Sequence, residues 1–343
     1  MIIGIAPVRI SFAGGGTDMP EFFNEYGGEV VSTTINRFTY AIIHPRYDKF
    51  FQAFSPDFQK HYTPTSLNKI KIKEGTEIAT ATTKYFNYKK GINIILCSDV
   101  PGGSGMGASS SLAVNLTNVL SKMSKKQMNK KEIAEIAFYI GRNVLKWPIG
   151  KQDEYSAAYG GLNHMKFQKN KTTTTPIPIS KSSKKELDEN LLLFFIGITR
   201  KSNDILIDQL KRIQNNDHQT INSLKNVKQL ANETYHSLKK SDITEFGIIL
   251  NRNWHAKKQF SKMITNSHID KIYDKAIDSG AIGGKLTGAG GGGHMLFYCE
   301  QSKQKKLINK MNQMGLNLID FKFYENGSNM INLDDELNKG NSN

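Results

Sequence analysis

Apolar and polar positions along the chain follow two alternating patterns. Stretches rich in Ile, Val, Phe and Tyr are typical of β-strands, and they cover residues 2–12, 29–44, 92–98, 162–167, 191–198, 294–299 and 317–324. Between them, apolar residues recur at helical spacing. One helical stripe contains Leu112, Leu116, Val119 and Met123, and a second contains Ile133, Ile136, Ile140 and Val144 and stops before Pro148.

The second half of the chain is more helical. Residues 202–265 contain few glycines and many charges, which predicts a long helical region. Segment 172–189 is polar and carries prolines, so it is our candidate domain boundary. A length of 343 residues suits one large or two moderate domains.

Composition limits the classes of partner. A net charge of +15 attracts nucleic acid, anionic lipid or phosphorylated small molecules, although a nucleotide-composition bias of the source would also enrich lysine. The lysines are scattered, and no helix carries a basic stripe with interleaved aromatics, so we expect no nucleic-acid partner. No apolar run reaches the ~18 residues of a membrane span, so we expect a cytoplasmic protein without a membrane partner.

Several residues with reactive or aromatic side chains are expected to be structural. Cys97 and Cys299 lie beside apolar stretches, which favours buried thiols over a disulfide or a zinc site. Trp147 and Trp254 are assigned to core packing. His294 follows a glycine run and is expected to be structural.

Glycine is concentrated in three loops. Gly14 to Gly16, the segment 102–107, and Gly288 with Gly290 to Gly293 hold twelve of the 29 glycines. Glycine lets a backbone approach a ligand without a Cβ in the way, so such loops suit phosphate groups. Tight turns also use glycine, and any one of these loops could be only a turn.

The middle loop, PGGSGMGASSS, does not fit the common nucleotide-binding templates. It matches the dinucleotide fingerprint in part, but no acidic residue follows at the required distance. Ala108 stands where a P-loop would carry its lysine. What remains is a Gly/Ser loop that leads into a helix, whose free N–H groups and dipole can hold a polyphosphate. Of the serines at the helix start, one could cap the helix and another could bind Mg²⁺.

The three glycine-containing segments resemble a known family. APVRISFAGGGTD, PGGSGMGASSS and KLTGAGGGGH are similar, in order and spacing, to the three motifs of the GHMP small-molecule kinases. The resemblance spans nearly the whole chain. RISFAGGGTDMPEFF is most similar to the first motif of the branch that acts on D-glycero-D-manno-heptose 7-phosphate, and fucokinases share a similar motif.

The resemblance implies a fold and a chemistry. The expected fold is α+β, with a ribosomal protein S5 domain 2-like N-terminal domain over 1–185 and a ferredoxin-like C-terminal domain over 186–335. The implied partners are ATP, Mg²⁺ and a sugar phosphate, whose C1 hydroxyl is phosphorylated for nucleotide-activated heptose synthesis. The ATP-binding residues implied are Pro101, Gly102, Gly103, Ser104, Gly105, Met106, Gly107, Ala108, Ser109, Ser110 and Ser111, with Ser109 as the metal ligand.

The resemblance also implies catalytic and acceptor residues. Asp153 matches the catalytic aspartate, and Arg9 matches the cation expected to keep it ionised. The acceptor residues implied are Gly15, Gly16, Thr17, Asp18, Gly288, Ala289, Gly290 and Gly291. Asp153 could instead cap a helix that starts at Glu154, Asp18 could cap a helix through Pro20 and Phe23, and Arg9 could be a surface charge.

Some roles have no motif. Arg142, Lys151 and Arg200 are candidates for binding the sugar's phosphate, and Glu132 and Glu135 for a second Mg²⁺ ligand. Within the family's chemistry, Asp153 acts either as a base or only to orient the acceptor. The alternatives for the whole chain are a GHMP kinase for L-fucose, another sugar or mevalonate, and a non-catalytic sugar-binding relative.

Overall fold

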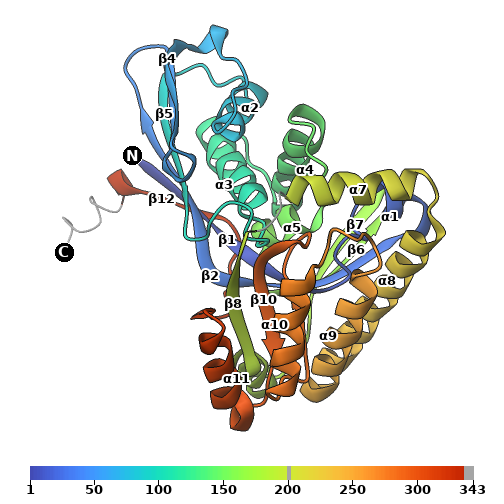
Figure 1. The fold of residues 1–343 in the computed structure, drawn as a ribbon. Coiled ribbons are helices and arrows are strands. Elements are labelled where there is room, and N and C mark those ends of the chain that lie inside the picture. Colours follow the sequence, from blue (N-terminus) through green and yellow to red (C-terminus); the bar gives the residue numbers. More distant parts are fainter. Residues whose placement is uncertain (199–201, 336–343) are drawn as a thin grey trace.

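Two antiparallel-rich sheets with helices packed on them make up the computed structural model, which describes residues 1–198 and 202–335 (Figure 1). The larger sheet has eight strands, in the order β12-β1-β2-β5-β3-β4, with β6 paired to β2 and β7 paired to β6. The smaller sheet has four strands, in the order β11-β8-β10-β9. The mixed α+β architecture expected from the sequence is confirmed.

The larger sheet is built around one long strand. β2 (Gly28–Pro45) pairs along its length with β1 (Ile2–Ala13), and also with β6 (Leu162–Gln168) near its start and β5 (Ile92–Ser98) near its end. These strands confirm the predictions for 2–12, 29–44, 92–98 and 162–167. The sequence patterns did not predict β3 (Phe50–Ser55), β4 (Lys60–Ser66), β7 (Lys171–Pro176) or β12 (Asn329–Asn332).

The helices of the first half cover one face of this sheet. They are α1 (Pro20–Tyr26), α2 (Glu77–Tyr85), α3 (Ala108–Met123), α4 (Lys130–Tyr139) and α5 (Gln152–Tyr159). α3 carries the first predicted stripe, and Leu112, Leu116 and Val119 are buried against the sheet. α4 continues into a π-helical turn, Ile140–Val144, so the second stripe is also helical.

The smaller sheet consists of β8 (Leu191–Ile198), β9 (Gly283–Leu286), β10 (Gly292–Tyr298) and β11 (Asn317–Ile319). The predicted strand 317–324 is shorter than expected, because β11 ends at Ile319 and only an isolated bridge joins Phe323 to Ile35. The helical prediction for 202–265 corresponds to α7 (Ser202–Gln214), α8 (His218–Lys239) and α9 (Ile243–Lys257). α10 (Ser267–Asp278) and α11 (Gln301–Gln313) complete this part.

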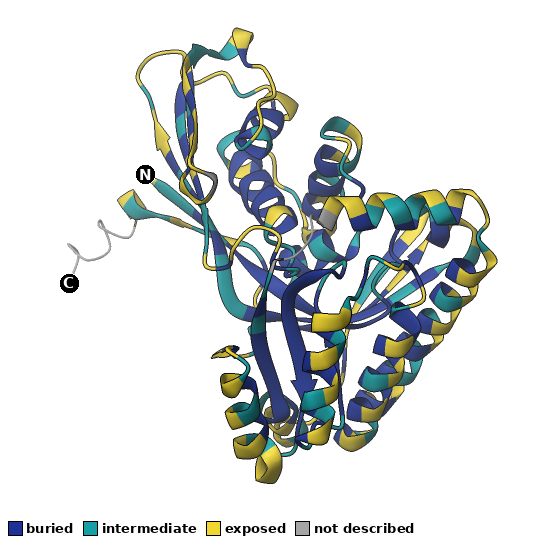
Figure 2. Ribbon diagram, in the orientation of Figure 1, coloured by how far each residue is buried: buried dark blue, intermediate teal, exposed yellow. Residues whose placement is uncertain are grey.

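An apolar core joins the two sheets. Phe12 of β1 contacts Phe246 of α9, with the ring centroids 5.0 Å apart, and Leu296 of β10 belongs to the same cluster. Figure 2 shows the central strands and the inner faces of the helices buried, and the outer helix faces and the edge strand β4 largely exposed. Lys285 of β9 adds a polar link, because its Nζ donates to the carbonyl oxygens of Ser11 and Phe12 at 2.8 and 3.1 Å. The end of β1 is thereby fixed to β9.

Segment 172–189 is ordered as β7 and α6 (Lys181–Asn190), and residue 185 lies inside α6, so the two-domain division at that point stays a prediction. Near the other end of the chain, β12 returns to the first sheet and pairs with residues 2–5 of β1.

Cys299 is buried as predicted, whereas Cys97 is only partly buried, and both thiols are free. Among the described residues, no helix combines the length and the apolarity of a membrane span.

Candidate active site

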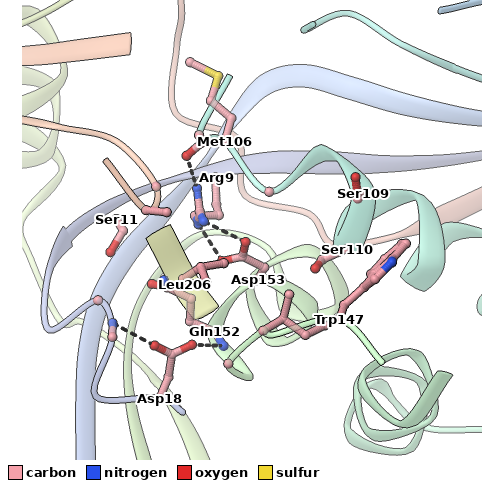
Figure 3. Close-up of a pocket in the computed structure, with 18 of the residues that line it drawn as sticks. Arg9, Ser11, Asp18, Met106, Ser109, Ser110, Trp147, Gln152, Asp153 and Leu206 are labelled. Carbon is pink, nitrogen blue, oxygen red and sulfur yellow. Dashed lines mark hydrogen bonds and ion pairs between the residues drawn. The ribbon is translucent and has the colours of Figure 1, made fainter. Parts of the chain in front are cut away.

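The three glycine-containing segments meet at one cavity of about 280 Å³ (Figure 3). One side is formed by the end of β1, the loop after it, residues 103–110 and the start of α5. The other side is formed by α7, the last residue of α9 and the loop at Gly288 and Ala289. Segments far apart in the sequence therefore share one pocket.

The middle loop leads directly into α3, as predicted. The N-cap of α3 is Gly107, with a φ of 74°, so the alternative in which a serine caps this helix is wrong. A Cβ at Gly107 would lie 2.7 Å from the Oδ2 of Asp153. Glycine at this position therefore lets the loop approach the carboxylate.

Most of the predicted ATP-binding residues border the cavity. Gly103, Ser104, Gly105, Met106, Gly107, Ala108, Ser109 and Ser110 all line it. Pro101 and Gly102 do not. Ser111 is turned into the protein, where its hydroxyl contacts that of Thr39 at 2.9 Å and donates to the carbonyl of Pro7 at 3.0 Å. The serine run thus divides into two cavity residues and one structural residue.

Arg9 and Asp153, which both line the cavity, form an ion pair (Figure 3). Arg9 Nε and Nη2 donate to the two carboxylate oxygens at 2.8 and 2.7 Å, and Nη1 donates to the carbonyl of Gly105 at 2.6 Å. Arg9 is only 4% exposed, so it is not a surface charge. α5 starts at Gln152 with Lys151 as its N-cap, so Asp153 does not cap this helix. The pair fixes the carboxylate next to the middle loop.

Asp18 is held by backbone amides. Its oxygens accept from the N–H of Gly16 and the N–H of Gln152, each at 3.0 Å. Burial raises the pKa of Asp18, and the neighbouring Asp153 carboxylate raises it further, while the two N–H groups oppose the shift. The N-cap of α1 is Met19, so the alternative that Asp18 caps this helix is wrong.

The other acceptor residues named from the sequence divide into two groups. Gly15, Gly16, Gly288 and Ala289 line the cavity together with Asp18. Thr17, Gly290 and Gly291 do not. The Thr17 hydroxyl donates to the carbonyl of Gly14 at 2.8 Å and accepts from the N–H of Glu29 at 3.1 Å. Gly291 donates its N–H to the carbonyl of Ile264 at 2.8 Å. These three residues shape the two loops.

The third glycine loop packs on the second. A Cβ at Gly288, whose φ is 67°, would lie 2.4 Å from the Cα of Gly105. His294 lies within hydrogen-bond distance of the Ser104 carbonyl, with Nδ1 at 2.9 Å, in agreement with a structural role. The two loops therefore form one packed unit beside the cavity.

A buried carboxyl group lies next to the ion pair. Glu154 is 1% exposed, and among the described residues neither of its oxygens has a hydrogen-bond partner of good geometry, although the Ser110 hydroxyl is close. Burial, with a smaller contribution from Asp153, raises the pKa of Glu154 to about 8. Glu154 is therefore largely neutral at neutral pH.

The geometry agrees with the family comparison. The chain matches the model for the GHMP kinases N terminal domain over residues 72–161 and that for the GHMP kinases C terminal domain over residues 234–317. A D-glycero-alpha-D-manno-heptose 7-phosphate kinase of Campylobacter jejuni is 32% identical over 94% of this chain and 96% of its own length. This chain belongs to the GHMP kinases. Members of this family use ATP.

Solved structures of GHMP kinases have the same fold. A D-glycero-D-manno-heptose 1-phosphate kinase from Bacteroides thetaiotaomicron superposes with a TM-score of 0.80 at 24% identity, covering 97% of this chain and 99% of that one. The Methanococcus jannaschii mevalonate kinase superposes with a TM-score of 0.71 at 21% identity, covering 94% and 98%. At these identities the similarity shows the fold alone.

Several residues proposed from the sequence lie away from the cavity of this GHMP kinase. Arg142 pairs with Glu21, and Lys151 pairs with Glu135 at 2.6 Å, so neither cation is free for a sugar phosphate. Glu132 forms a capping box with Asn129 at the start of α4. Arg200 lies outside the described residues.

The cavity also contains residues that the sequence did not indicate. Trp147 lines it and packs on the core at the same time, and Trp254 is buried as predicted. The further polar residues on the lining are Glu77, Gln152, Asn203, Gln209 and Lys257. None of them belongs to a glycine motif, so only the tertiary fold could identify them.

Proposed function

We propose that this GHMP kinase transfers the terminal phosphoryl group of ATP to the C1 hydroxyl of D-glycero-D-manno-heptose 7-phosphate. The products would be the 1,7-bisphosphate and ADP. The observation that carries this proposal is the ion pair of Arg9 and Asp153, which lies in the cavity next to the loop 103–110. The similarity to the Campylobacter heptose 7-phosphate kinase supports the choice of acceptor.

The nucleotide is proposed to lie along the middle loop. The first N–H groups of α3 have no partner within the helix, and its dipole favours negative charge at this end. Gly103, Gly105 and Gly107 all have positive φ, which produces the sharp turns before the helix. The phosphates would be bound by backbone donors, with no lysine needed in this loop.

Two oxygen ligands on the cavity wall fit Mg²⁺. Ser109 is exposed at the start of α3, and Glu77 at the start of α2 also lines the cavity. Among the described residues, the Oε2 atom of Glu77 is buried without a hydrogen-bond partner. Hydroxyl and carboxylate oxygens suit this hard cation, which when bound would neutralise phosphate charge. We propose Glu77 in place of Glu132 and Glu135 as the acidic ligand.

Asp153 is proposed to accept the proton from the C1 hydroxyl. As the hydroxyl oxygen bonds to the terminal phosphorus, the bond from phosphorus to the ADP oxygen breaks and the proton passes to the carboxylate. Arg9 holds both carboxylate oxygens and so fixes the direction of the base. If Asp153 only orients the hydroxyl, the carboxylate does not need to accept a proton. Substitution of Asp153 distinguishes this role from that of a base.

The acceptor is proposed to lie between the first motif and α7. Asp18, Gln152 and Gln209 offer carboxylate and amide groups suited to sugar hydroxyls. Three buried side-chain atoms have no partner within the described residues: the Ser11 hydroxyl oxygen, the Gln152 side-chain oxygen and the Gln209 side-chain nitrogen. Unpartnered buried polar atoms are costly, and a polyhydroxylated ligand would satisfy them.

Mass spectrometry of the product tests the proposal. The protein is incubated with ATP, Mg²⁺ and D-glycero-D-manno-heptose 7-phosphate, and we expect a bisphosphate in which the new ester is at C1. Parallel reactions contain L-fucose, other sugars and mevalonate. Turnover of one of these with unchanged heptose 7-phosphate would move the assignment to another GHMP reaction, and sugar binding without any transfer would indicate a non-catalytic relative.

A further inference from the structure

We propose that Lys257 binds a phosphate group in the cavity, as a substrate-binding residue outside the three glycine motifs. This inference rests on the proposed function, because it concerns the same cavity. The phosphate is either the ester already present on the acceptor or the terminal phosphoryl group of ATP. Both present the same chemistry to an ammonium group, and the experiment below distinguishes them.

The cations on the cavity wall are few. Among the described residues, the lining contains only Arg9 and Lys257 as basic side chains. Arg9 is already engaged, because its guanidinium donates to both oxygens of Asp153 and to the carbonyl of Gly105. Of the basic side chains on the described lining, Lys257 is therefore the one left for a dianionic phosphate.

Lys257 is placed to make that contact. It is the last residue of α9, is only 5% exposed, and donates from Nζ to the carbonyl of Gly288. Gly288 packs directly on Gly105 of the middle loop. The ammonium group thus lies at the junction of the two glycine loops, and an ammonium has three donors, of which this contact uses one.

The environment of Lys257 leaves its charge uncompensated. Within the described residues it forms no ion pair with a carboxylate, and the charged groups that influence it are Arg9 on β1, Asp18 after β1 and Lys285 on β9. Burial, and then the positive charge of Arg9, lower the pKa of Lys257 to about 7, against a smaller opposite effect of Asp18. A buried cation without a partner is costly, and an anionic ligand would remove that cost.

Lys285 is a buried lysine with a different assignment. Its Nζ donates to two carbonyl groups at the end of β1, and it does not line the cavity. Lys285 therefore has a complete structural role without a ligand. Lys257 has one carbonyl partner and an open side toward the cavity, which is the arrangement of a binding group.

Kinetics and binding separate the two sources of phosphate. In the acceptor arm, kcat/KM is compared for heptose 7-phosphate and for the same heptose without phosphate. In the nucleotide arm, the affinity for a nonhydrolysable ATP analogue is compared with that for ADP, without acceptor. Each is measured for the wild type, for Lys257→Met and for the control Lys258→Met, whose side chain pairs with Asp270 outside the lining.

We expect Lys257→Met to lower one of the two preferences about 10- to 100-fold, because a hydrogen bond to a charged group is removed. These preferences are the kcat/KM ratio of phosphorylated to unphosphorylated heptose and the affinity ratio of the ATP analogue to ADP. A loss confined to heptose 7-phosphate assigns the acceptor ester, and a loss of the preference for the analogue over ADP assigns the terminal phosphoryl group. Lys258→Met should behave as the wild type in both. If Lys257→Met keeps both preferences, the proposal is wrong.

Calorimetry gives a readout that a merely structural lysine would not change. At about pH 8 a phosphate monoester is already a dianion, whereas Lys257 is largely neutral until the ligand draws a proton onto it. The protein is titrated with heptose 7-phosphate, and separately with the nonhydrolysable ATP analogue, in two buffers of different ionisation enthalpy. For the ligand whose phosphate Lys257 binds, the wild type should take up protons on binding, and Lys257→Met should take up fewer. Equal uptake in both proteins would contradict the proposal. If the wild type fails to phosphorylate heptose 7-phosphate, the proposed function fails, while the nucleotide arm still tests Lys257.

Discussion

The two sides of the cavity differ in how their charges are satisfied. On the N-terminal wall, which comprises Arg9, Asp18, Asp153 and the loop 103–110, the charged groups are paired with each other or with backbone amides. On the C-terminal wall, formed by α7, Lys257 and Gly288, the basic side chain of Lys257 has a single carbonyl partner, and the side-chain nitrogen of Gln209 has none within the described residues. Unpartnered polar atoms also occur on the N-terminal side, at the neutral side chains of Ser11, Ser104 and Gln152 and at the proposed metal ligand Glu77.

This difference suggests a division of labour. Groups that are already fixed in geometry can act in the reaction without reorganising, which is the usual requirement for catalysis. Groups without partners gain most when a ligand arrives and so contribute to binding and selectivity. We therefore expect substitutions of the paired Arg9 and Asp153 to lower kcat, and substitutions of Lys257 and Gln209 to raise KM.

The largest effect is expected at Asp153. Asp153→Asn should reduce kcat by about 10² to 10⁴-fold, because the amide cannot accept the proton of the hydroxyl. The Arg9 side chain can still donate to the amide oxygen, so the fold should be kept. Steady-state kinetics measure the loss, and Asp208→Asn, which changes a carboxylate of α7 that is not on the lining, is the control. Turnover near that of the wild type would show that Asp153 only orients the acceptor.

The next effect concerns the contact between the two glycine loops. Gly288→Ala adds a Cβ 2.4 Å from the Cα of Gly105 at a φ of 67°, so strain and overlap should together cost about 2 to 4 kcal/mol of unfolding free energy. Gly315→Ala has a φ of 79° with no atom within 4 Å of the new Cβ, so it carries the backbone strain alone. Urea unfolding compares the two. Equal losses would mean that the packing of the loops contributes nothing.

A smaller effect is expected at Glu154. The folded protein keeps this carboxyl protonated to about pH 8, whereas the unfolded chain releases the proton near the ordinary value of 4.5. Below pH 4.5 the carboxyl is protonated in both states, so Glu154 then contributes its full stability. Between pH 4.5 and about 8 only the unfolded chain loses the proton, so the free energy of unfolding falls as the pH rises. Glu154→Gln should remove this dependence of the unfolding free energy on pH and stabilise the protein by about 1 to 3 kcal/mol at neutral pH. Unfolding curves at several pH values measure it, and an unchanged slope would contradict a neutral Glu154.

The smallest effect tests the C-terminal wall directly. Gln209→Met should raise the KM for the sugar about 10-fold and leave kcat nearly unchanged, because it removes one uniform binding contact. Gln214→Met, at an exposed position of the same helix, is the control. A fall in kcat with unchanged KM would place Gln209 among the groups that act in the transition state and would break the proposed division between the walls.

Candidate site residues could be predicted from the sequence where they lie within one contiguous motif. Arg9, Asp18 and the loop 103–107 lie within glycine-containing motifs, and the structure brings them together with Asp153 in one cavity. The strands that were predicted are those with unbroken apolar or alternating patterns. β7 is a run of threonines at a sheet edge, and β12 has only four residues, so neither carries such a pattern.

Side chains whose roles depend on tertiary contacts could not be assigned. Arg142 has the right charge for a sugar phosphate, but its partner Glu21 lies 121 positions away along the chain. Lys257 and Gln209 lie on helices whose pattern gives only the buried face and not which neighbour that face meets. The groups that we propose for catalysis could therefore be predicted from motifs, whereas those that we propose for acceptor binding could be found only in the fold.

The return of β12 to the first sheet has a consequence for synthesis. β1 is translated long before β12, so residues 2–5 gain their second neighbour only when residues 329–332 have left the ribosome. Until then the strand presents unpaired backbone groups along that border, where another nascent chain could attach. Deletion of β12 should therefore lower the yield of soluble protein during expression, even though β12 does not line the cavity.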